Sequence, residues 1–158
     1  MRRTKGFSLI ELLIVVAIIL IIAAIAVPSF LRSRIAAAES SAVAAVRTVN
    51  TAQISYNSAY PTVGFASSLG ALGGTSCTPP TSSGACLIDS VLAAGQRSGY
   101  SFSLTNVTGT PSGSYNVIAS PIVWDYSGMR YFCSYEDGVV RYSMTQVTTC
   151  DNTVSPQN

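Results

Sequence analysis

The fold of this chain is decided by residues 5–27, which read KGFSLIELLIVVAIILIIAAIAV. A helix over residues 7–27 rises about 30 Å, which is the thickness of the hydrocarbon core of a bilayer. One acid, Glu11, interrupts the apolar side chains that follow Leu9. A carboxylate at the centre of a membrane costs roughly 2.5–3.5 kcal/mol, and less near the end of the helix, so Glu11 still needs a partner. The stretch therefore predicts a membrane helix that carries one functional acid.

The residues around this helix resemble a signal peptide only in part. Residues 1–5 carry three basic side chains ahead of the apolar run, as a secretory signal does. A secretory signal has a shorter apolar core and ends in a small-residue cleavage pattern, whereas residues 28–30 continue as Pro-Ser-Phe. A plain membrane anchor is the simpler alternative, but it explains neither the Gly6-Phe7 pair nor Glu11.

Residues 5–16 resemble the class III signal of type IV pilins and of type II secretion pseudopilins, and the strong resemblance extends to residue 30. In that family a membrane peptidase cuts after the glycine on the cytoplasmic face, and the new N-terminal residue is N-methylated. The resemblance implies cleavage between Gly6 and Phe7 and methylation of Phe7. It also implies that Glu11 is the acid used in assembly and that Pro28 is the helix-kinking proline.

The same resemblance implies a fold and a set of partners. The fold is α+β, the type IV pilin fold, in which a long N-terminal helix spans the membrane with its first half and packs on a C-terminal antiparallel β-sheet domain. The chain is then a structural subunit of a type IV pilus that polymerises with copies of itself, for adhesion or motility. The further partners are the prepilin peptidase and methyltransferase, and the inner-membrane assembly platform with its extension ATPase. The subunit would lie in the inner membrane with a cytoplasmic N-terminus before assembly, and in an extracellular pilus afterwards.

Three classes of function stay open on the sequence. The first is a pilus subunit, which the paired cysteines and the size of the domain favour. The second is a pseudopilin of a type II protein secretion system, which shares the same processing and assembly chemistry. The third is a membrane-anchored enzyme or binding module whose N-terminus resembles a pilin by coincidence.

Composition argues against catalysis and against nucleic-acid binding. The chain has nine Lys plus Arg, seven Asp plus Glu and no His. Loss of the three basic leader residues changes the formal charge from +2 to −1, and a new terminal amine brings it near zero. No basic stripe is present to bind a phosphate backbone, and the usual side chains for general-base catalysis are few. We therefore expect no enzyme activity and no cofactor.

Four cysteines follow the membrane segment, namely Cys77, Cys86, Cys133 and Cys150. An even number of cysteines in an exported region predicts disulfides, and four cysteines allow three connectivities. The pairs Cys77–Cys86 and Cys133–Cys150 are favoured because each closes a local loop, and the second resembles the tie between C-terminal segment and sheet in many type IV pilins. A zinc site needs tight Cys-x-x-Cys pairs or histidines, so no metal is expected.

The chain divides into six predicted segments. They are a leader peptide at 1–6, a transmembrane and polymerisation helix at 7–28, an amphipathic helix at 29–58, an αβ loop at 59–99, an antiparallel sheet with a disulfide-bounded region at 100–150, and a flexible tail at 151–158. Pro28 lacks a backbone donor and clashes with the carbonyl of Ala24, which predicts a kink. Apolar and small side chains of the amphipathic helix recur every three or four residues, at Leu31, Ile35, Ala38, Ala42, Ala45, Val49, Ala52 and Tyr56.

The C-terminal half has the two-residue period of strands. Residues 100–105 alternate strictly between apolar and polar side chains, and further strands are predicted at 115–119, 129–135 and 139–144. Glu136-Asp137-Gly138 is a strong hairpin signal between the last two. A helical turn is expected at 69–74 and a short helix at 87–96. The acids Glu136, Asp137 and Asp151 leave a calcium site as an alternative to solvated turn and tail residues.

Overall fold

The structure, a computed structural model, describes residues 6–74 and 77–157. Residues 1–5 of the predicted leader therefore lie outside the described residues. The chain forms two compact units, Met1–Arg34 and Ile35–Asn158. One helix, α1 (Leu9–Ala59), contributes residues to both units. Its observed end is one residue beyond the predicted end at residue 58.

In the first unit, α1 presents an apolar surface to its surroundings. Its most apolar 18 residues have a mean hydropathy of 3.3, and none of them is buried. By length and composition this helix is able to cross a membrane. Ile and Val are mediocre helix formers in water, but in lipid every backbone N–H and C=O must be paired within the segment, which a helix achieves. The helix is assigned without a break through Pro28, and the kink stays a prediction.

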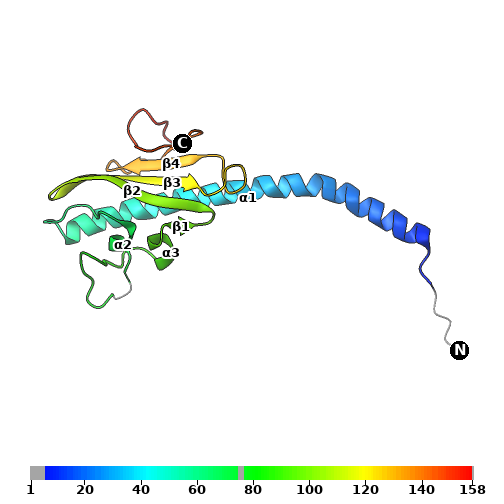
Figure 1. The fold of residues 1–158 in the computed structure, drawn as a ribbon, viewed down its shortest axis with the longest axis horizontal. Helices are drawn as coiled ribbons and strands as arrows, with labels where there is room; N and C mark the ends of the chain where they lie inside the picture. The colour runs from blue at the N-terminus through cyan, green and yellow to red at the C-terminus, as the bar shows by residue number, and fades with distance from the viewer. Residues whose placement is uncertain (1–5, 75–76, 158) are drawn as a thin grey trace. The chain divides into compact units, whose positions relative to one another are not determined.

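The second unit contains a five-stranded antiparallel sheet in the sequential order β1-β2-β3-β4-β5 (Figure 1). The strands are β1 (Gln96–Arg97), β2 (Tyr100–Gly109), β3 (Ser112–Pro121), β4 (Tyr131–Tyr135) and β5 (Arg141–Ser143). The long helix and the antiparallel sheet confirm the predicted α+β, pilin-like architecture. The sequence does not reveal β1, because two residues are too few to show an alternation.

Strands β2 and β3 are longer than the predicted segments 100–105 and 115–119. Their pairing continues to the hairpin tip, where Gly109 lies opposite Ser112, through register shifts after Thr105. The shifts disrupt the regular alternation of side chains between the two faces. A period-two pattern in the sequence therefore does not reveal this part of the strand. The hairpin between β4 and β5 forms where it is expected, and Gly138 has a φ of 73° there.

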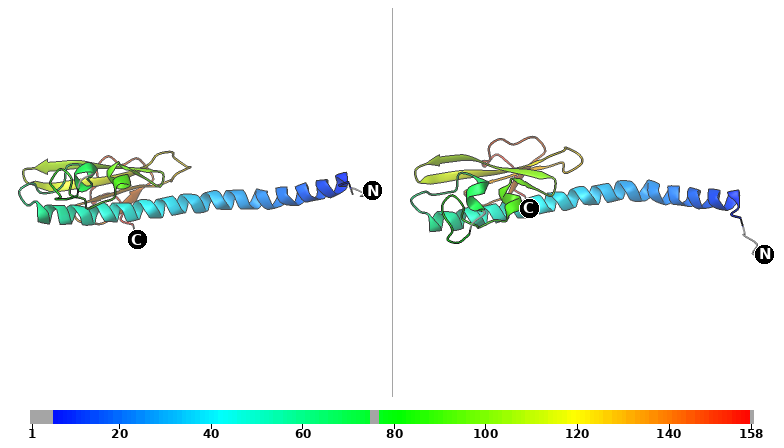
Figure 2. Two further views of the ribbon diagram at one scale, coloured as in Figure 1. Left: turned by 90° about the horizontal axis from the view of Figure 1, so that it is seen from below. Right: turned by 60° about the horizontal axis from the view of Figure 1, so that its bottom comes forward.

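The core of the second unit lies between α1 and one face of the sheet (Figure 2). The predicted helical stripe supplies it, since Ala42, Ala45, Val49, Ala52 and Tyr56 are all buried. The alanines bring the helix backbone close to the strands. The sheet contributes the buried side chains of Tyr100, Phe102, Tyr115, Val117, Ala119 and Phe132.

Two short helices lie in the loop between α1 and the sheet. Helix α2 (Leu69–Leu72) falls within the expected turn at 69–74. Helix α3 (Ser90–Ala93) is shorter than the expected helix at 87–96. It begins where the Asp89 carboxylate accepts hydrogen bonds from the N–H groups of Val91 and Leu92, at 3.0 Å each. It ends before Gly95, whose φ of 81° is left-handed, because the chain must turn there to enter β1.

The C-terminal residues pair with the outer edge of the sheet. The N–H of Tyr142 donates to the carbonyl of Ser155, and the N–H of Gln157 donates to the carbonyl of Val140, both at 2.9 Å. A flexible tail at 151–158 stays a prediction, and these contacts within residues 151–157 argue against it. They also cover part of the β5 edge, which would otherwise offer unpaired backbone groups to another chain.

Candidate functional site

Gly6 and Phe7, the predicted cleavage site, lie in an exposed segment that precedes α1. The helix begins at Leu9, and the side chain of Phe7 is 78% exposed. A Cβ atom added at Gly6 would meet no atom within 4 Å. The fold itself therefore places no steric demand for glycine at position 6, so any such demand must come from an enzyme that binds the peptide.

Glu11 lies in the first turn of α1 and is exposed. Among the described residues it has no ion-pair partner. The predicted cleavage before Phe7 would create a terminal amine, which the described chain does not yet carry. The roles of Gly6, Phe7 and Glu11 accordingly stay predictions at this point.

The side chains around Glu11 belong to an exposed apolar surface that runs along α1 in the first unit. They include Leu9, Ile10, Leu12, Leu13, Ile14 and Ile18, each more than half exposed. Fully burying one such side chain stabilises by about 1.5–3 kcal/mol. Exposing an apolar surface of this extent to water is unfavourable, so lipid or another protein must cover it.

The two disulfides of the structure join the pairs that the sequence favours, Cys77–Cys86 and Cys133–Cys150. The second links β4 to the segment that follows β5. Its sulfurs lie in a small apolar cluster with Ile118 and Val147. The first closes a loop in the segment between α1 and the sheet. The C-terminal segment is thus held to the sheet covalently as well as by backbone hydrogen bonds.

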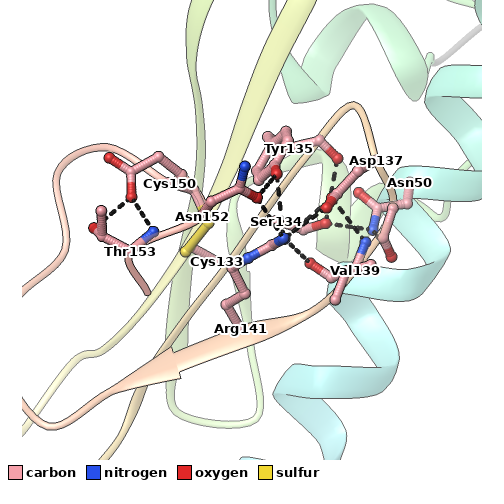
Figure 3. Close-up of polar contacts among 12 residues, drawn as sticks. Asn50, Cys133, Ser134, Tyr135, Asp137, Val139, Arg141, Cys150, Asn152 and Thr153 are labelled. Carbon is pink, nitrogen blue, oxygen red and sulfur yellow. Dashed lines mark hydrogen bonds and ion pairs between the residues drawn. A yellow bond between two sulfur atoms is a disulfide. The ribbon is translucent and has the colours of Figure 1, made fainter. Parts of the chain in front are cut away.

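Arg141 organises the polar contacts beside the Cys133–Cys150 disulfide (Figure 3). Its guanidinium forms an ion pair with Asp137 at 2.7 Å and donates to the carbonyl of Val139 at 3.0 Å. It also lies 4.5 Å from the centre of the Tyr135 ring and donates to Asn152 at 3.3 Å. Because the Arg141 side chain is only 8% exposed, these contacts fix the hairpin turn against the C-terminal segment.

The charges in this cluster have physical consequences. Burial by itself raises the pKa of Asp137, but hydrogen bonds from Arg141 and from the N–H of Val139 outweigh it and hold that pKa below its usual value. The Thr153 hydroxyl and N–H lower the pKa of Asp151.

Among the described residues, no group of three or more His, Cys, Asp or Glu side chains is arranged to hold a metal ion. Because Asp137 is already paired with Arg141, the structure gives no support to a calcium site at Glu136, Asp137 and Asp151.

Asn50 connects α1 to three parts of the sheet domain. Its amide nitrogen donates to the Ser134 hydroxyl at 2.8 Å and to the carbonyl of Gly138 at 3.2 Å. Its carbonyl oxygen accepts from the Tyr115 hydroxyl at 3.2 Å. Asn50 is not among the residues predicted from the sequence, although a polar residue beside the apolar stripe of a helix is a signal that the sequence contains.

Glu39 is a second buried polar residue that is not among those predicted from the sequence. Its carboxylate accepts from the N–H of Met129 at 2.9 Å and forms an ion pair with Arg130 at 2.6 Å. The Glu39 side chain is 8% exposed, whereas that of Arg130 is 34% exposed. This contact ties the loop between β3 and β4 to the part of α1 where the second unit begins.

Comparisons with known proteins agree with the N-terminal resemblance. Residues 1–27 match the family described as the prokaryotic N-terminal methylation motif. The chain is 48% identical over 54 residues to a type IV major pilin protein, PilA, of Myxococcus xanthus, a match that covers 34% of this chain and 24% of that protein. It is 62% identical over 34 residues to a type IV wide pilus major component, PilA4, of Thermus thermophilus, covering 22% of this chain and 26% of that protein. No solved structure matches the chain significantly.

These matches support the resemblance to type IV pilins. The chain spans about a quarter of the length of each of the two curated relatives.

Proposed function

We propose that this chain, whose N-terminal residues carry the prokaryotic N-terminal methylation motif, is a structural subunit of a type IV pilus. A prepilin peptidase removes residues 1–6, and Phe7 becomes the methylated N-terminal residue. The mature subunit waits in the inner membrane with a cytoplasmic N-terminus. The assembly platform and its extension ATPase then move it into an extracellular filament that serves adhesion or motility.

The single observation that carries this proposal is the exposed apolar surface of α1 directly after Gly6-Phe7. None of its most apolar 18 residues is buried within the chain. Lipid covers such a surface before assembly, and the same surfaces of other copies cover it in a filament. One helix therefore serves both as an anchor and as a polymerisation surface.

Glu11 gives the assembled helices a register. Cleavage creates a positive amine on Phe7, and the amine of an incoming subunit meets Glu11 of a neighbour. Unit charges about 4 Å apart attract by roughly 4 kcal/mol at an effective dielectric constant near 20. Desolvation offsets much of that attraction, because a buried ion pair adds little net stability. A Glu11 left unpaired among apolar helices is costly, so one stagger is preferred over the others.

The alternative is a pseudopilin of a type II secretion system. Both curated relatives reported above are named as pilus components, which favours the pilus. The two functions predict different phenotypes for cells that lack the chain.

A deletion strain complemented with the wild-type chain tests the proposal. Shearing the complemented cells should release filaments in which this chain is the main protein, and the deletion strain should release none. A deletion strain that keeps its filaments but fails to secrete exoproteins would instead support the pseudopilin. A chain found only in the membrane, under conditions in which the cells bear pili, would contradict the proposal.

A further inference from the structure

The loop between β3 and β4 displays the most concentrated apolar surface of the second unit. Within residues 122–129, five large apolar side chains are 44–52% exposed. They are Ile122, Val123, Trp124, Tyr126 and Met129. Exposed aromatic and apolar side chains gathered in this way mark interaction surfaces more often than isolated ones do.

Internal contacts hold this loop in one conformation. The Ser127 hydroxyl and N–H bond to the carbonyl of Val123, at 2.9 Å each. The Trp124 ring stacks on Tyr131 with a centroid distance of 5.5 Å. Gly128 packs so tightly on Tyr100 that an added Cβ would lie 1.9 Å from the Tyr100 hydroxyl oxygen. A loop ordered before binding loses little conformational entropy on binding, which favours its use as an interface.

Among the described residues of the second unit, one cation and the acid of this apolar loop have no ion-pair partner. Three of its four arginines, Arg97, Arg130 and Arg141, form ion pairs within the unit. The fourth, Arg47, is exposed on α1 and has no ion pair among the described residues. Asp125, in the middle of the apolar loop, is exposed and likewise has no ion pair among them.

Arg47 and Asp125 are therefore both available to form an ion pair with a second molecule. The neighbours of Arg47 on the exposed side of α1 are small, namely Ala44, Thr48 and Thr51, so its guanidinium is accessible to a loop of another chain. Arg47 lies on α1 and Asp125 lies in the loop between β3 and β4, so a pairing of the two across copies would join different elements of the two subunits. Contact between two different surfaces of identical subunits is heterologous, and repeated it generates an open helical filament.

We propose that the loop at residues 122–129 of one copy docks on the exposed side of α1 of a second copy, with Asp125 paired to Arg47. The apolar side chains of the loop cover the small residues around Arg47, and the ion pair sets the position of the contact. This proposal rests on the proposed filament, because it names a subunit contact within it. A lipid surface is the less suitable occupant, since the loop carries the acid Asp125, and the cation that follows the loop, Arg130, is already paired with Glu39.

Charge exchange in the full chain tests the contact. Arg47→Glu and Asp125→Lys are each expected to lower the yield of sheared filaments to about a tenth of wild type, because each places like charges opposite one another. The double variant Arg47→Glu with Asp125→Lys should restore at least half of the yield. Asp125→Asn, which suits the left-handed φ of 62° at this position, separates the loss of charge from backbone strain and should give an intermediate yield.

Glu136→Lys is the matched control, because Glu136 is exposed and has no ion pair among the described residues. It should leave the filament yield at the wild-type level. Each variant should retain the Cys133–Cys150 disulfide and a wild-type amount of subunit in the membrane, which shows that the unit is folded. Variants that keep both but show no rescue in the double variant overturn the proposed pairing.

A photoreactive amino acid in place of Trp124 identifies the occupant directly. Irradiation of filaments should link it to residues 44–51 of another copy, as mapped by mass spectrometry. Linkage to lipid alone, or to another region of the subunit, overturns the proposal while leaving the pilus assignment intact. A wild-type chain that forms no filament at all contradicts the proposed function instead.

Discussion

Replacing Glu11 with Ala should abolish or sharply reduce filaments while leaving the subunit in the membrane. Glu11 is exposed and has no ion pair among the described residues, so its loss leaves the structure of the single subunit unchanged. In the proposed filament, the same change would leave the amine of a neighbour buried without a partner. Breaking a buried ion pair in this way costs about 3–5 kcal/mol. About 3 kcal/mol corresponds to a loss of affinity of roughly a hundredfold for each added subunit.

The assay compares the filament protein released by shearing with the subunit level in the membrane, both by immunoblot. Glu11→Gln is the matched control for shape, since it removes the charge and keeps the length of the side chain, and it should lose filaments as Glu11→Ala does. Glu11→Asp keeps the charge with a shorter reach and should retain part of the yield. Cleavage after Gly6 should persist in all three variants. Wild-type filament yield from Glu11→Ala as the only subunit would refute the pairing mechanism, though not the pilin-like assignment.

Three further predictions concern Gly6, the Cys133–Cys150 disulfide and Tyr115. A bulky residue in place of Gly6 should block cleavage and leave unprocessed subunits in the membrane, whereas Gly6→Ala should be tolerated; normal processing of Gly6→Trp by intact mass would contradict this. Loss of the Cys133–Cys150 disulfide, which spans a sequence separation of 17, should lower the stability of the subunit by about 3 kcal/mol, and non-reducing peptide maps with crossed pairs would show the assignment wrong. Burial raises the pKa of Tyr115 to about 12, above its unfolded value near 10, so its contribution to stability should be complete below pH 10 and decline up to about pH 12. Tyr115→Phe should flatten this alkaline decline in denaturant titrations, and an unchanged slope would exclude Tyr115 as its source.

The helix and most of the sheet follow from periodic patterns in the sequence. The stripe from Ala38 to Tyr56 predicts the face of α1 that packs on the sheet, since apolar residues three and four apart share one side of a helix. Strand β2 is visible from Tyr100 because its side chains alternate. The hairpin between β4 and β5 is visible because Gly138 supplies a conformation with positive φ.

The parts that the sequence hides depend on long-range contacts. Glu39, Asn50 and Gln53 are polar residues within a helix, and only the folded structure shows that each is buried with a partner far away in the chain. The pairing of residues 155–157 with β5 is hidden for the same reason, because a short polar segment has no alternation of its own. Helix α3 is shorter than expected because Gly95 turns the chain into β1, which is itself too short to predict.

The candidate processing site is visible in the sequence alone, whereas the loop at residues 122–129 is not. Gly6, Phe7 and Glu11 form a short, contiguous pattern, which is what the proposed processing and assembly would require. The loop has no such pattern. Its apolar side chains become notable only when the structure shows that they are exposed and that Ser127, Gly128 and Tyr131 hold them in place.

The intact mass of the protein in purified, sheared filaments is the most direct test of the central claim. A processed pilus subunit predicts a chain that begins at Phe7, carries one added methyl group on its terminal amine and contains two intact disulfides. Fragmentation of the N-terminal peptide locates the methyl group on Phe7. A filament protein that retains Met1, or that begins at any other residue, would contradict the account.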